Sequence, residues 1–440
     1  MRKKPIVNNK LSTRSKEILT KDSLFVSPSY TRGHNMVVDS GKGMWITDTD
    51  GNRYLDFTAG IAVCSTGHCH PKVVKAIKKQ ADKLIHMSGT DFYYELQVNL
   101  AERLSKLRGI PAKVYFGNSG AEAVEAAFKL ARWHRNRPLN IAFSGAFHGR
   151  TMGALSLTGS KSIQKDQFHP LVPQVYHFPY AYCYRCPYNK SAVDCNMECV
   201  EAIHEAFNKY IPANQVAAIF VEPIQGEGGY IVPPKKFLEG LKSISEEHGI
   251  LLVFDEVQAG MGRTGKMFAY EHFGVQPDIL TLAKGIASGM PLGATIALDR
   301  IMSWPPGSHA STFGGNPISC AAALTTIDLL ENELIENASY MGRRLIWGLS
   351  DLEKSYEFIG NVRGSGLMIG MEIVKGRETK EKWPKIRDRI VDKAFEKGLL
   401  LLSCGETSIR FSPPLVVNSE EIDTCLSILE DVFKDILKSL

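Results

Sequence analysis

Residues 250–258 read Ile-Leu-Leu-Val-Phe-Asp-Glu-Val-Gln, and this stretch decides the fold. The apolar run is too short for a buried helix and charged residues follow it at once, so it predicts a buried strand over residues 250–254. Val216–Val221 and Ile279–Leu282 have the same form. Apolar strands alternating with helical segments are typical of a parallel sheet covered on both faces. The sequence therefore predicts a large α/β domain over about residues 70–330.

The segments on either side of this domain predict a smaller α+β domain. Residues 43–57 alternate apolar and polar side chains around a turn-rich centre, which is the pattern of a β-hairpin. After the large domain, the pattern of apolar residues predicts helices at 327–352 and 383–397 and strands at 367–372 and Ser408–Phe411. We expect residues 1–69 and 331–440 to build this smaller domain together.

Composition excludes several classes of protein. The chain of 440 residues is 44% hydrophobic and 22% charged, which is enough for two domains with a large core. Its 52 basic and 47 acidic residues give a mild net charge of +5, and the one basic cluster, residues 1–10, is interpreted as a solvated tail. Nucleic-acid binding is therefore not expected. No apolar run approaches the roughly 18 residues of a membrane span, so we expect a cytoplasmic protein without a membrane partner.

Charged and polar side chains follow each of the three predicted strands. Glu222 and Glu227 follow the first, Asp255 and Gln258 follow the second, and Lys284 follows the third. Ligands of open parallel sheets bind at the carboxyl ends of the strands. We therefore expect one amine and several carboxylates to meet at one edge of the sheet.

Lys284 is the candidate nucleophile. A desolvated lysine amine forms Schiff bases with carbonyl compounds, and an aldehyde cofactor is its natural partner here. A buried aspartate such as Asp255 can keep a pyridine ring protonated, so that the ring accepts electrons when a substrate bond breaks. A purely structural ion pair between the two side chains explains the spacing equally well.

A second motif predicts an anion site. Residues 115–122, Tyr-Phe-Gly-Asn-Ser-Gly-Ala-Glu, end an apolar run and begin a helix, with Ser119 and Glu122 forming a capping box. Free amides at Ser119, Gly120 and Ala121 and the helix dipole favour an anion such as phosphate. Capped helix starts are common, however, and most of them bind no ligand.

The motifs together resemble the class III aminotransferases, the ω-amino-acid branch of the fold type I pyridoxal-phosphate enzymes. The match covers about residues 51–414, most of the chain. In order it comprises residues 67–71 (GHCHP), 117–122 (GNSGAE), 147–151 (FHGRT), 222–229 (EPIQGEGG), 255–258 (DEVQ), 284–285 (KG), 312–317 (TFGGNP) and 410–414 (RFSPP). The resemblance implies a large domain with a mainly parallel seven-stranded sheet covered by helices.

The resemblance also implies a cofactor, pyridoxal 5′-phosphate. Lys284 would carry it as a Schiff base and then move the substrate proton, while Asp255 would pair with the ring nitrogen. The other implied contacts are Ser119, Gly120 and Ala121 at the phosphate, Phe147 on the ring, Gln258 near the phenolic oxygen, His148 and Glu222 in the same site, and Thr312 from a neighbouring subunit. A homodimer or higher homo-oligomer follows. A core aromatic is the alternative for Phe147.

Four further residues are implied to bind substrate. Arg410 resembles the family's carboxylate clamp, because a guanidinium grips both oxygens at once, and Glu227 resembles its switchable partner. Arg150 resembles a second carboxylate contact. Ile61 occupies a position that is aliphatic in 4-aminobutyrate-type members and aromatic in ornithine-type members. The expected reaction is ping-pong transfer from a 4-aminobutyrate-like ω-amino acid to a 2-oxo acid such as 2-oxoglutarate. Structural salt bridges are the alternative for both arginines.

Other functions stay open on the sequence alone. An amino-acid racemase can use the same lysine on the same scaffold, and ornithine δ-aminotransferase is a second variant of the reaction. A noncatalytic binding protein is the third alternative, and it would have to keep the lysine, aspartate, glutamine and arginine of the motifs without using them for catalysis.

The chain also contains a cysteine-rich insertion. Four of its nine cysteines have a spacing that suits four thiolate ligands of zinc or an iron–sulfur cluster: Cys183, Cys186, Cys195 and Cys199. Reduced thiols or local disulfides explain the insertion equally, and the spread of the other cysteines gives no secreted disulfide framework.

Overall fold

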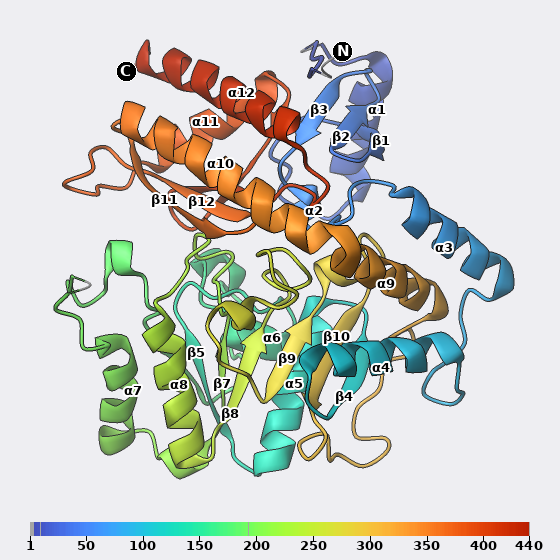
Figure 1. Ribbon diagram of the computed structural model, residues 1–440, viewed down its shortest axis with the longest axis vertical. Coiled ribbons are helices and arrows are strands. Elements are labelled where there is room, and N and C mark those ends of the chain that lie inside the picture. The colour runs from blue at the N-terminus through green and yellow to red at the C-terminus, as the bar shows by residue number, and fades with distance from the viewer. Residues whose placement is uncertain (1–3, 9, 192, 440) are drawn as a thin grey trace.

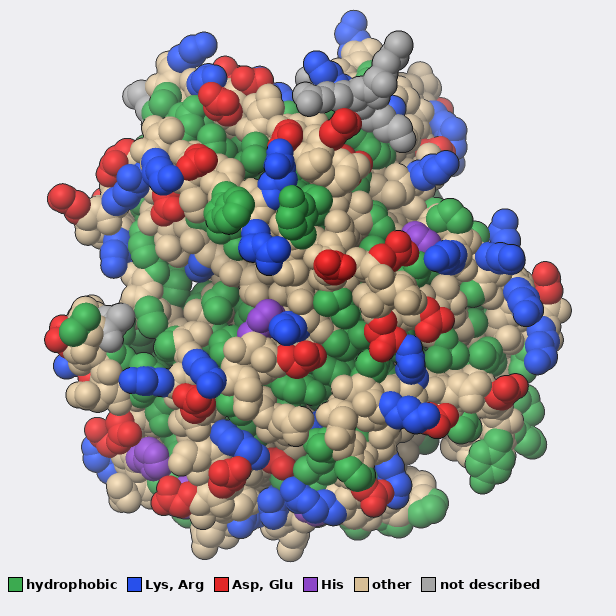
Figure 2. Space-filling view, in the orientation of Figure 1, with side chains coloured by type: hydrophobic (Ala, Val, Ile, Leu, Met, Phe, Trp, Pro, Cys, Tyr) green, Lys and Arg blue, Asp and Glu red, His purple; other side chains and the backbone are tan. Residues whose placement is uncertain are grey.

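The structure, a computed structural model, describes residues 4–8, 10–191 and 193–439. Residues 1–3 and 9 of the predicted basic tail lie outside this part. On the face shown in Figure 2, acidic and basic side chains are interspersed over the surface. None of the described helices is long and apolar enough to cross a membrane.

A seven-stranded sheet forms the centre of the larger half of the molecule (Figure 1). Its order is β4-β10-β9-β8-β7-β5-β6, and only β10 runs antiparallel to its two neighbours. The strands are β4 Ala112–Gly117, β5 Leu139–Phe143, β6 Val175–Phe178, β7 Val216–Val221, β8 Leu251–Asp255, β9 Ile279–Leu282 and β10 Gly293–Leu298. The expected fold, a mainly parallel sheet covered by helices, is confirmed.

The central strands form where the sequence is wholly apolar. Every residue of β7, β8 and β9 is buried, which is what a parallel sheet with two covered faces requires. The predicted bounds of β7 and β9 are correct, and β8 is shifted by one residue. Helices cover the two faces and the edges, among them α4 Glu95–Arg108, α5 Gly120–Arg135, α6 Met152–Leu157, α7 Glu198–Lys209 and α8 Lys235–His248.

The C-terminal part builds a four-stranded antiparallel sheet under long helices, drawn in orange and red in Figure 1. Its strands are β11 Ile359–Ser365, β12 Met368–Ile373, β14 Leu402–Cys404 and β15 Ser408–Phe411, and its helices are α10 Ile335–Ser355, α11 Pro384–Glu396 and α12 Ser419–Leu437. The helix predicted over residues 327–352 is divided. Helix α9, Pro317–Leu329, passes into α10 through a π-helical turn at Leu330–Leu334, whose wider winding keeps both end leucines buried.

The two ends of the chain meet in a third sheet. Strands β1 Val38–Lys42, β2 Trp45–Asp48 and β3 Arg53–Asp56 are antiparallel neighbours, and β13 Leu399–Leu400 pairs with β3 in parallel. The N-terminal segment also contains α1 Thr13–Phe25, the short turn α2 Ala59–Ala62 and α3 Pro71–Lys83. This pairing agrees with a smaller unit made from both chain ends, while the division after residues 69 and 330 stays a prediction.

Candidate active site

A cavity of about 400 Å³ lies at the carboxyl ends of the parallel strands, as the strand-end pattern predicts. Ten of the predicted site residues line it: Ser119, Gly120, Ala121, Phe147, His148, Arg150, Glu222, Asp255, Gln258 and Lys284. They come from distant parts of the chain, so the fold alone brings them together.

Asp255 is the last residue of β8 and is buried. Its Oδ2 lies 2.7 Å from His148 Nδ1, and its Oδ1 accepts a hydrogen bond from the Val257 amide. Burial disfavours a charged imidazole, but the hydrogen bond and the charge of Asp255 outweigh burial and raise the pKa of His148. The pair therefore holds the carboxylate in one orientation at the floor of the cavity.

Lys284 follows β9 and lines the same cavity. Its backbone φ is 47°, a left-handed conformation that non-glycine residues rarely adopt and that clusters at functional sites. Burial lowers the pKa of its amine, while the carboxylates of Asp255 and Glu222 oppose this effect. The neutral, nucleophilic form is therefore populated at lower pH than in free lysine.

The predicted anion site has the expected helix start. Ser119 is the N-cap of α5, and its side chain accepts a hydrogen bond from the Glu122 amide. The capping box is only half as predicted, because the Glu122 carboxylate binds the amide and side chain of Asn118 instead of the amide of Ser119. A carboxylate Oε2 can bond both Asn118 groups at once from this position. The amides of the α5 N-terminus border the cavity and can bind a phosphate.

Glu222 and Gln258 fix the rim of the cavity. Buried Glu222 accepts hydrogen bonds from the amides of Phe147 and Gly226, and burial raises its pKa to about 7. The Gln258 Oε1 accepts a hydrogen bond of 2.8 Å from Tyr230. Glu222 thus positions the loop that carries Phe147 and His148, and the carboxamide of Gln258 is held in one orientation.

Arg410 and Glu227 form the ion pair that the resemblance implies. Arg410 Nη1 donates to Glu227 Oε1 at 2.7 Å, and the two side chains are only 7% and 15% exposed. Burial opposes a charged guanidinium, yet Glu227 raises the pKa of Arg410. Both charges also act on the amine of Lys284, so the pair lies near it.

Three other predicted substrate and cofactor residues lie at the surface or at the edge of the site. Thr312 and Ile61 are exposed and do not line the cavity of their own chain. Arg150 lines the cavity, and its guanidinium lies over the ring of Phe147, 5.6 Å from the ring centroid. Ile61 lies in a run of left-handed residues, Ala59 to Ala62, a strained conformation for a β-branched side chain.

Sequence reasoning missed several contacts of the site. Val63 and Val257 add apolar surface to the cavity, and Tyr230 fixes Gln258. The position of Val257 between Asp255 and Gln258 was the available signal, since it shares their loop. No sequence signal marks Lys161, whose Nζ lies 3.7 Å from Glu227 Oε2.

The residues present fit pyridoxal phosphate. The cavity joins an amine of lowered pKa, a buried carboxylate held by His148, and a helix start with free amides. The close approach of the anion turn to its neighbours is also evident, because a Cβ on Gly120 would lie 2.7 Å from Val257. Amine, carboxylate and anion cradle are the groups that the aldehyde, ring nitrogen and phosphate of this cofactor need.

The four cysteines of the insertion lie near one another without forming a ligand set. Burial and the neighbouring thiols raise the pKa of Cys199 to about 12. Among the described residues, the four thiols are not part of any group of three or more possible ligand residues whose ligand atoms all lie within 4.8 Å of one another. The metal hypothesis stays a prediction for elemental analysis, in which less than about half an equivalent of zinc or iron would contradict it.

Gly293 offers a test of the anion turn. A Cβ added there would lie 2.2 Å from the carbonyl oxygen of Ser119. Gly293→Ala must therefore displace the turn, and overpacking of about 1–3 kcal/mol predicts a cofactor affinity about fivefold to 150-fold below wild type. Gly33→Ala, which meets no atom within 4 Å, is the control. Equal cofactor dissociation constants for Gly293→Ala and wild type, measured by fluorescence titration, would contradict this role.

Comparison with known proteins agrees with the geometry. The profile of the family "Aminotransferase class-III" matches residues 26–433. Acetylornithine aminotransferase of Methanocaldococcus jannaschii is 43% identical over 92% of this chain and 94% of its own length. Alanine/serine racemase of Pyrococcus horikoshii is 40% identical over 96% of this chain and 91% of its own.

Solved structures give the same assignment. A Bacillus anthracis aminotransferase superimposes with a TM-score of 0.90 at 30% identity and covers 97% of this chain and 100% of its own. An amine transaminase from an uncultivated Pseudomonas species, solved with pyridoxal phosphate bound, has a TM-score of 0.87 at 32% identity and covers 98% and 99%. The cofactor is therefore pyridoxal 5′-phosphate, and this chain belongs to the class III aminotransferase family of enzymes.

Proposed function

We propose that this enzyme transfers the terminal amino group of an ω-amino acid to a 2-oxo acid such as 2-oxoglutarate. The observation that carries the proposal is the buried Arg410–Glu227 pair close to Lys284. When Glu227 neutralises Arg410, the site contains no unpaired positive charge. Such a site suits a donor that carries no carboxylate next to its reacting amine. Relatives named acetylornithine aminotransferase support a donor of the acetylornithine or ornithine kind over 4-aminobutyrate.

Pyridoxal phosphate, when bound, supplies an aldehyde that links to amines and a ring that accepts electrons. The chain supplies the proton chemistry. Lys284, whose pKa is lowered by burial, holds the aldehyde and moves the proton at the substrate carbon through its Nζ. Asp255, oriented by His148, would pair with the ring nitrogen. Phe147, which lines the cavity, would cover the ring and exclude water.

Both substrates use one site in turn. The closed Arg410–Glu227 pair suits the ω-amino donor, whereas a 2-oxo acid brings a carboxylate that can replace Glu227 on the guanidinium. Arg150, exposed at the cavity mouth, is free to bind the second carboxylate of a dicarboxylic acceptor. The proposed order is therefore ping-pong, with donor and acceptor sharing Lys284.

A homo-oligomer belongs to this proposal. Thr312 is exposed and outside the cavity of its own chain, which supports a phosphate contact supplied to a neighbouring subunit. The test mixes and refolds inactive Lys284→Ala and Thr312→Val chains. A hybrid dimer should have one site that combines an intact Lys284 with an intact Thr312 of the other chain, so activity should reappear in the mixture. Additive activities without any hybrid gain would contradict shared sites.

Racemisation is the second candidate, because relatives named alanine/serine racemase and leucine/methionine racemase are each 40% identical to this chain. A racemase needs the same lysine, but it does not need a substrate carboxylate to replace Glu227 on Arg410. The donor screen separates the two: N-acetylornithine, ornithine, 4-aminobutyrate, alanine and leucine are each incubated with and without 2-oxoglutarate. Glutamate formed from an ω-donor supports the proposal; loss of optical activity without an oxo acid supports the racemase.

Arg410→Met should weaken the acceptor half of the reaction. The change removes the carboxylate clamp and leaves Glu227 without its buried partner. The kcat/KM for 2-oxoglutarate should therefore fall at least about 30-fold, which corresponds to a loss of about 2 kcal/mol of transition-state stabilisation. Arg343→Met, at an exposed position of α10, is the control. A variant with unchanged kcat/KM for 2-oxoglutarate in steady-state assays would rule out the clamp.

A further inference from the structure

Glu227 lies between two cations. Its Oε1 accepts the hydrogen bond from buried Arg410, and its Oε2 lies 3.7 Å from Lys161 Nζ. Lys161 is 45% exposed and has no other ion-pair partner among residues 4–8, 10–191 and 193–439. Burial alone would raise the pKa of Glu227, but Arg410 and then Lys161 outweigh it and hold that pKa below its ordinary value. The carboxylate therefore stays charged in a largely buried place.

A carboxylate exchange at Arg410 creates a problem for Glu227. Once a substrate carboxylate occupies the guanidinium, Glu227 is a mostly buried anion without its partner, which is costly. Space exists on the Lys161 side, because a cavity of about 780 Å³ is lined there by Lys161 together with Gln225 and Gly228, close neighbours of Glu227 in sequence. A small side-chain rotation can thus bring Glu227 closer to Lys161.

We propose that Lys161 is a positioning residue that holds Glu227 whenever a substrate carboxylate occupies Arg410. This inference rests on the proposed function. Lys161 is not among the residues that line the cavity of Lys284. It therefore acts on the site through Glu227, its ion-pair partner. Its effect is confined to the half-reaction in which Arg410 binds a carboxylate.

The test compares the two half-reactions of the holoenzyme by stopped-flow kinetics. Lys161→Met should raise the concentration of 2-oxoglutarate needed for half-maximal rate by about three- to tenfold, the size expected of a partly exposed ion pair. The maximal rate and the ω-donor half-reaction should change less than about twofold, and Lys161→Arg should behave as wild type. Lys236→Met, at an exposed position of α8, is the control.

Two results would overturn the role of Lys161. One is an unchanged 2-oxoglutarate dependence in Lys161→Met; the other is an equal loss in both half-reactions, which indicates a general structural effect. Failure of the proposed function looks different, because wild type itself would then give no oxo product from any ω-donor.

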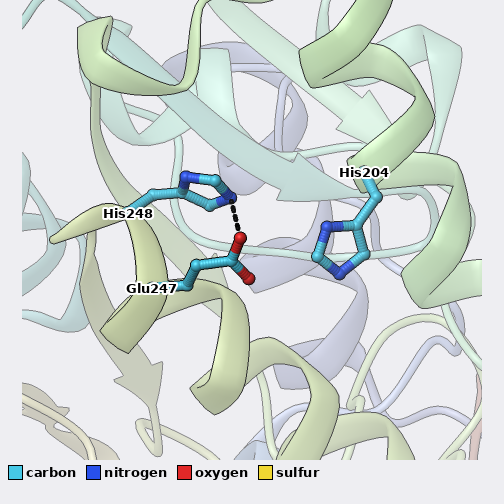
Figure 3. Close-up of side chains that lie close together, drawn as sticks. All are labelled: His204, Glu247 and His248. Atoms are coloured by element: carbon cyan, nitrogen blue, oxygen red, sulfur yellow. Dashed lines mark ion pairs between the residues drawn. The ribbon is translucent and has the colours of Figure 1, made fainter.

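A separate surface cluster carries a second inference. His204 on α7 and Glu247 and His248 at the end of α8 point toward one another (Figure 3). Their possible ligand atoms all lie within 4.8 Å of one another, with His248 Nε2 3.5 Å from Glu247 Oε1. Phe207 packs edge-on against the His248 ring and restricts it. The site holds no ion and is partly open to solvent.

The geometry points to a zinc site that joins α7 and α8. Two imidazoles and one carboxylate are a ligand set that Zn²⁺ accepts, with water in the fourth position. A contraction of about 1 Å between the ligand atoms is enough to reach zinc distances. Binding to the folded state only would stabilise these helices against unfolding.

Titration of the holoenzyme with zinc chloride tests this site. Wild type should bind one equivalent of zinc per chain more than His204→Ala or His248→Ala. Zinc should also raise the melting temperature of wild type and leave that of the two variants unchanged. His134→Ala is the control. Cobalt substitution separates this site from the four cysteines, because only thiolate ligands give sulfur-to-metal charge-transfer bands. Equal binding by wild type and both variants, or no bound equivalent in wild type, would overturn the site.

Discussion

Lys284→Ala should lower kcat by at least about 10⁴-fold, the upper range for loss of a positioned general acid–base group. Lys284 is the only lysine that lines the cavity among the residues that the structure describes. Without its amine, the aldehyde of the cofactor has no attachment and the substrate proton has no carrier. The absorbance band of the lysine-bound cofactor should also be lost, which a spectrum of the purified variant measures.

Controls separate chemistry from folding in this variant. Circular dichroism and melting temperature should stay close to wild type, because Asp255 keeps its hydrogen bond to His148 and Glu227 keeps its ion pair with Arg410. Added methylamine should restore part of the activity, since a free amine can carry the proton. A folded variant that retains more than about a tenth of wild-type kcat would exclude Lys284 as the catalytic amine.

Asp255→Asn should lower kcat by about 10³-fold, the size found when a preorganised charge is removed from a buried site. Asparagine keeps the shape and can still accept the Val257 hydrogen bond, so the loss reports the missing charge opposite the ring nitrogen. His148→Gln should lower kcat less, because it leaves the Asp255 carboxylate in place and removes only the hydrogen bond that orients it. The kcat values of wild type, Asp255→Asn and His148→Gln are measured by steady-state kinetics at saturating cofactor.

The comparison for Asp255 is Asp299→Asn, at an exposed position after β10. It should leave kcat within about twofold, as surface changes usually do. If Asp255→Asn also kept wild-type kcat, the carboxylate would have only a structural role, and the ion-pair explanation of the sequence motif would stand.

Much of the large domain could be predicted because its strands carry a local signal. Wholly apolar runs such as Val216–Val221 form buried strands regardless of their partners, and the charged residues that follow them must then meet at one edge. The strand-end pattern thus predicts that Asp255 and Lys284 meet at one edge of the sheet, and both line the same cavity. The motif at Ser119 added the anion turn for the same local reason.

Pairings between distant parts of the chain had no such local signal. Strand β10 is antiparallel between β4 and β9, which depends on where the chain returns rather than on its composition. Thr312 and Ile61 are exposed in the single chain, so the contacts expected of them stay predictions. The bond between His148 and Asp255 joins residues 107 positions apart, and only the fold shows it.

The most direct test of the central claim is a single-turnover measurement with donor alone. Holoenzyme is mixed with N-acetylornithine or ornithine without any oxo acid, and the oxo product is counted per active site. Transamination predicts one equivalent of product, no further release, and resumed turnover when 2-oxoglutarate is added. A donor that is recovered in full with no oxo product, while alanine or leucine loses optical activity under the same conditions, would contradict it.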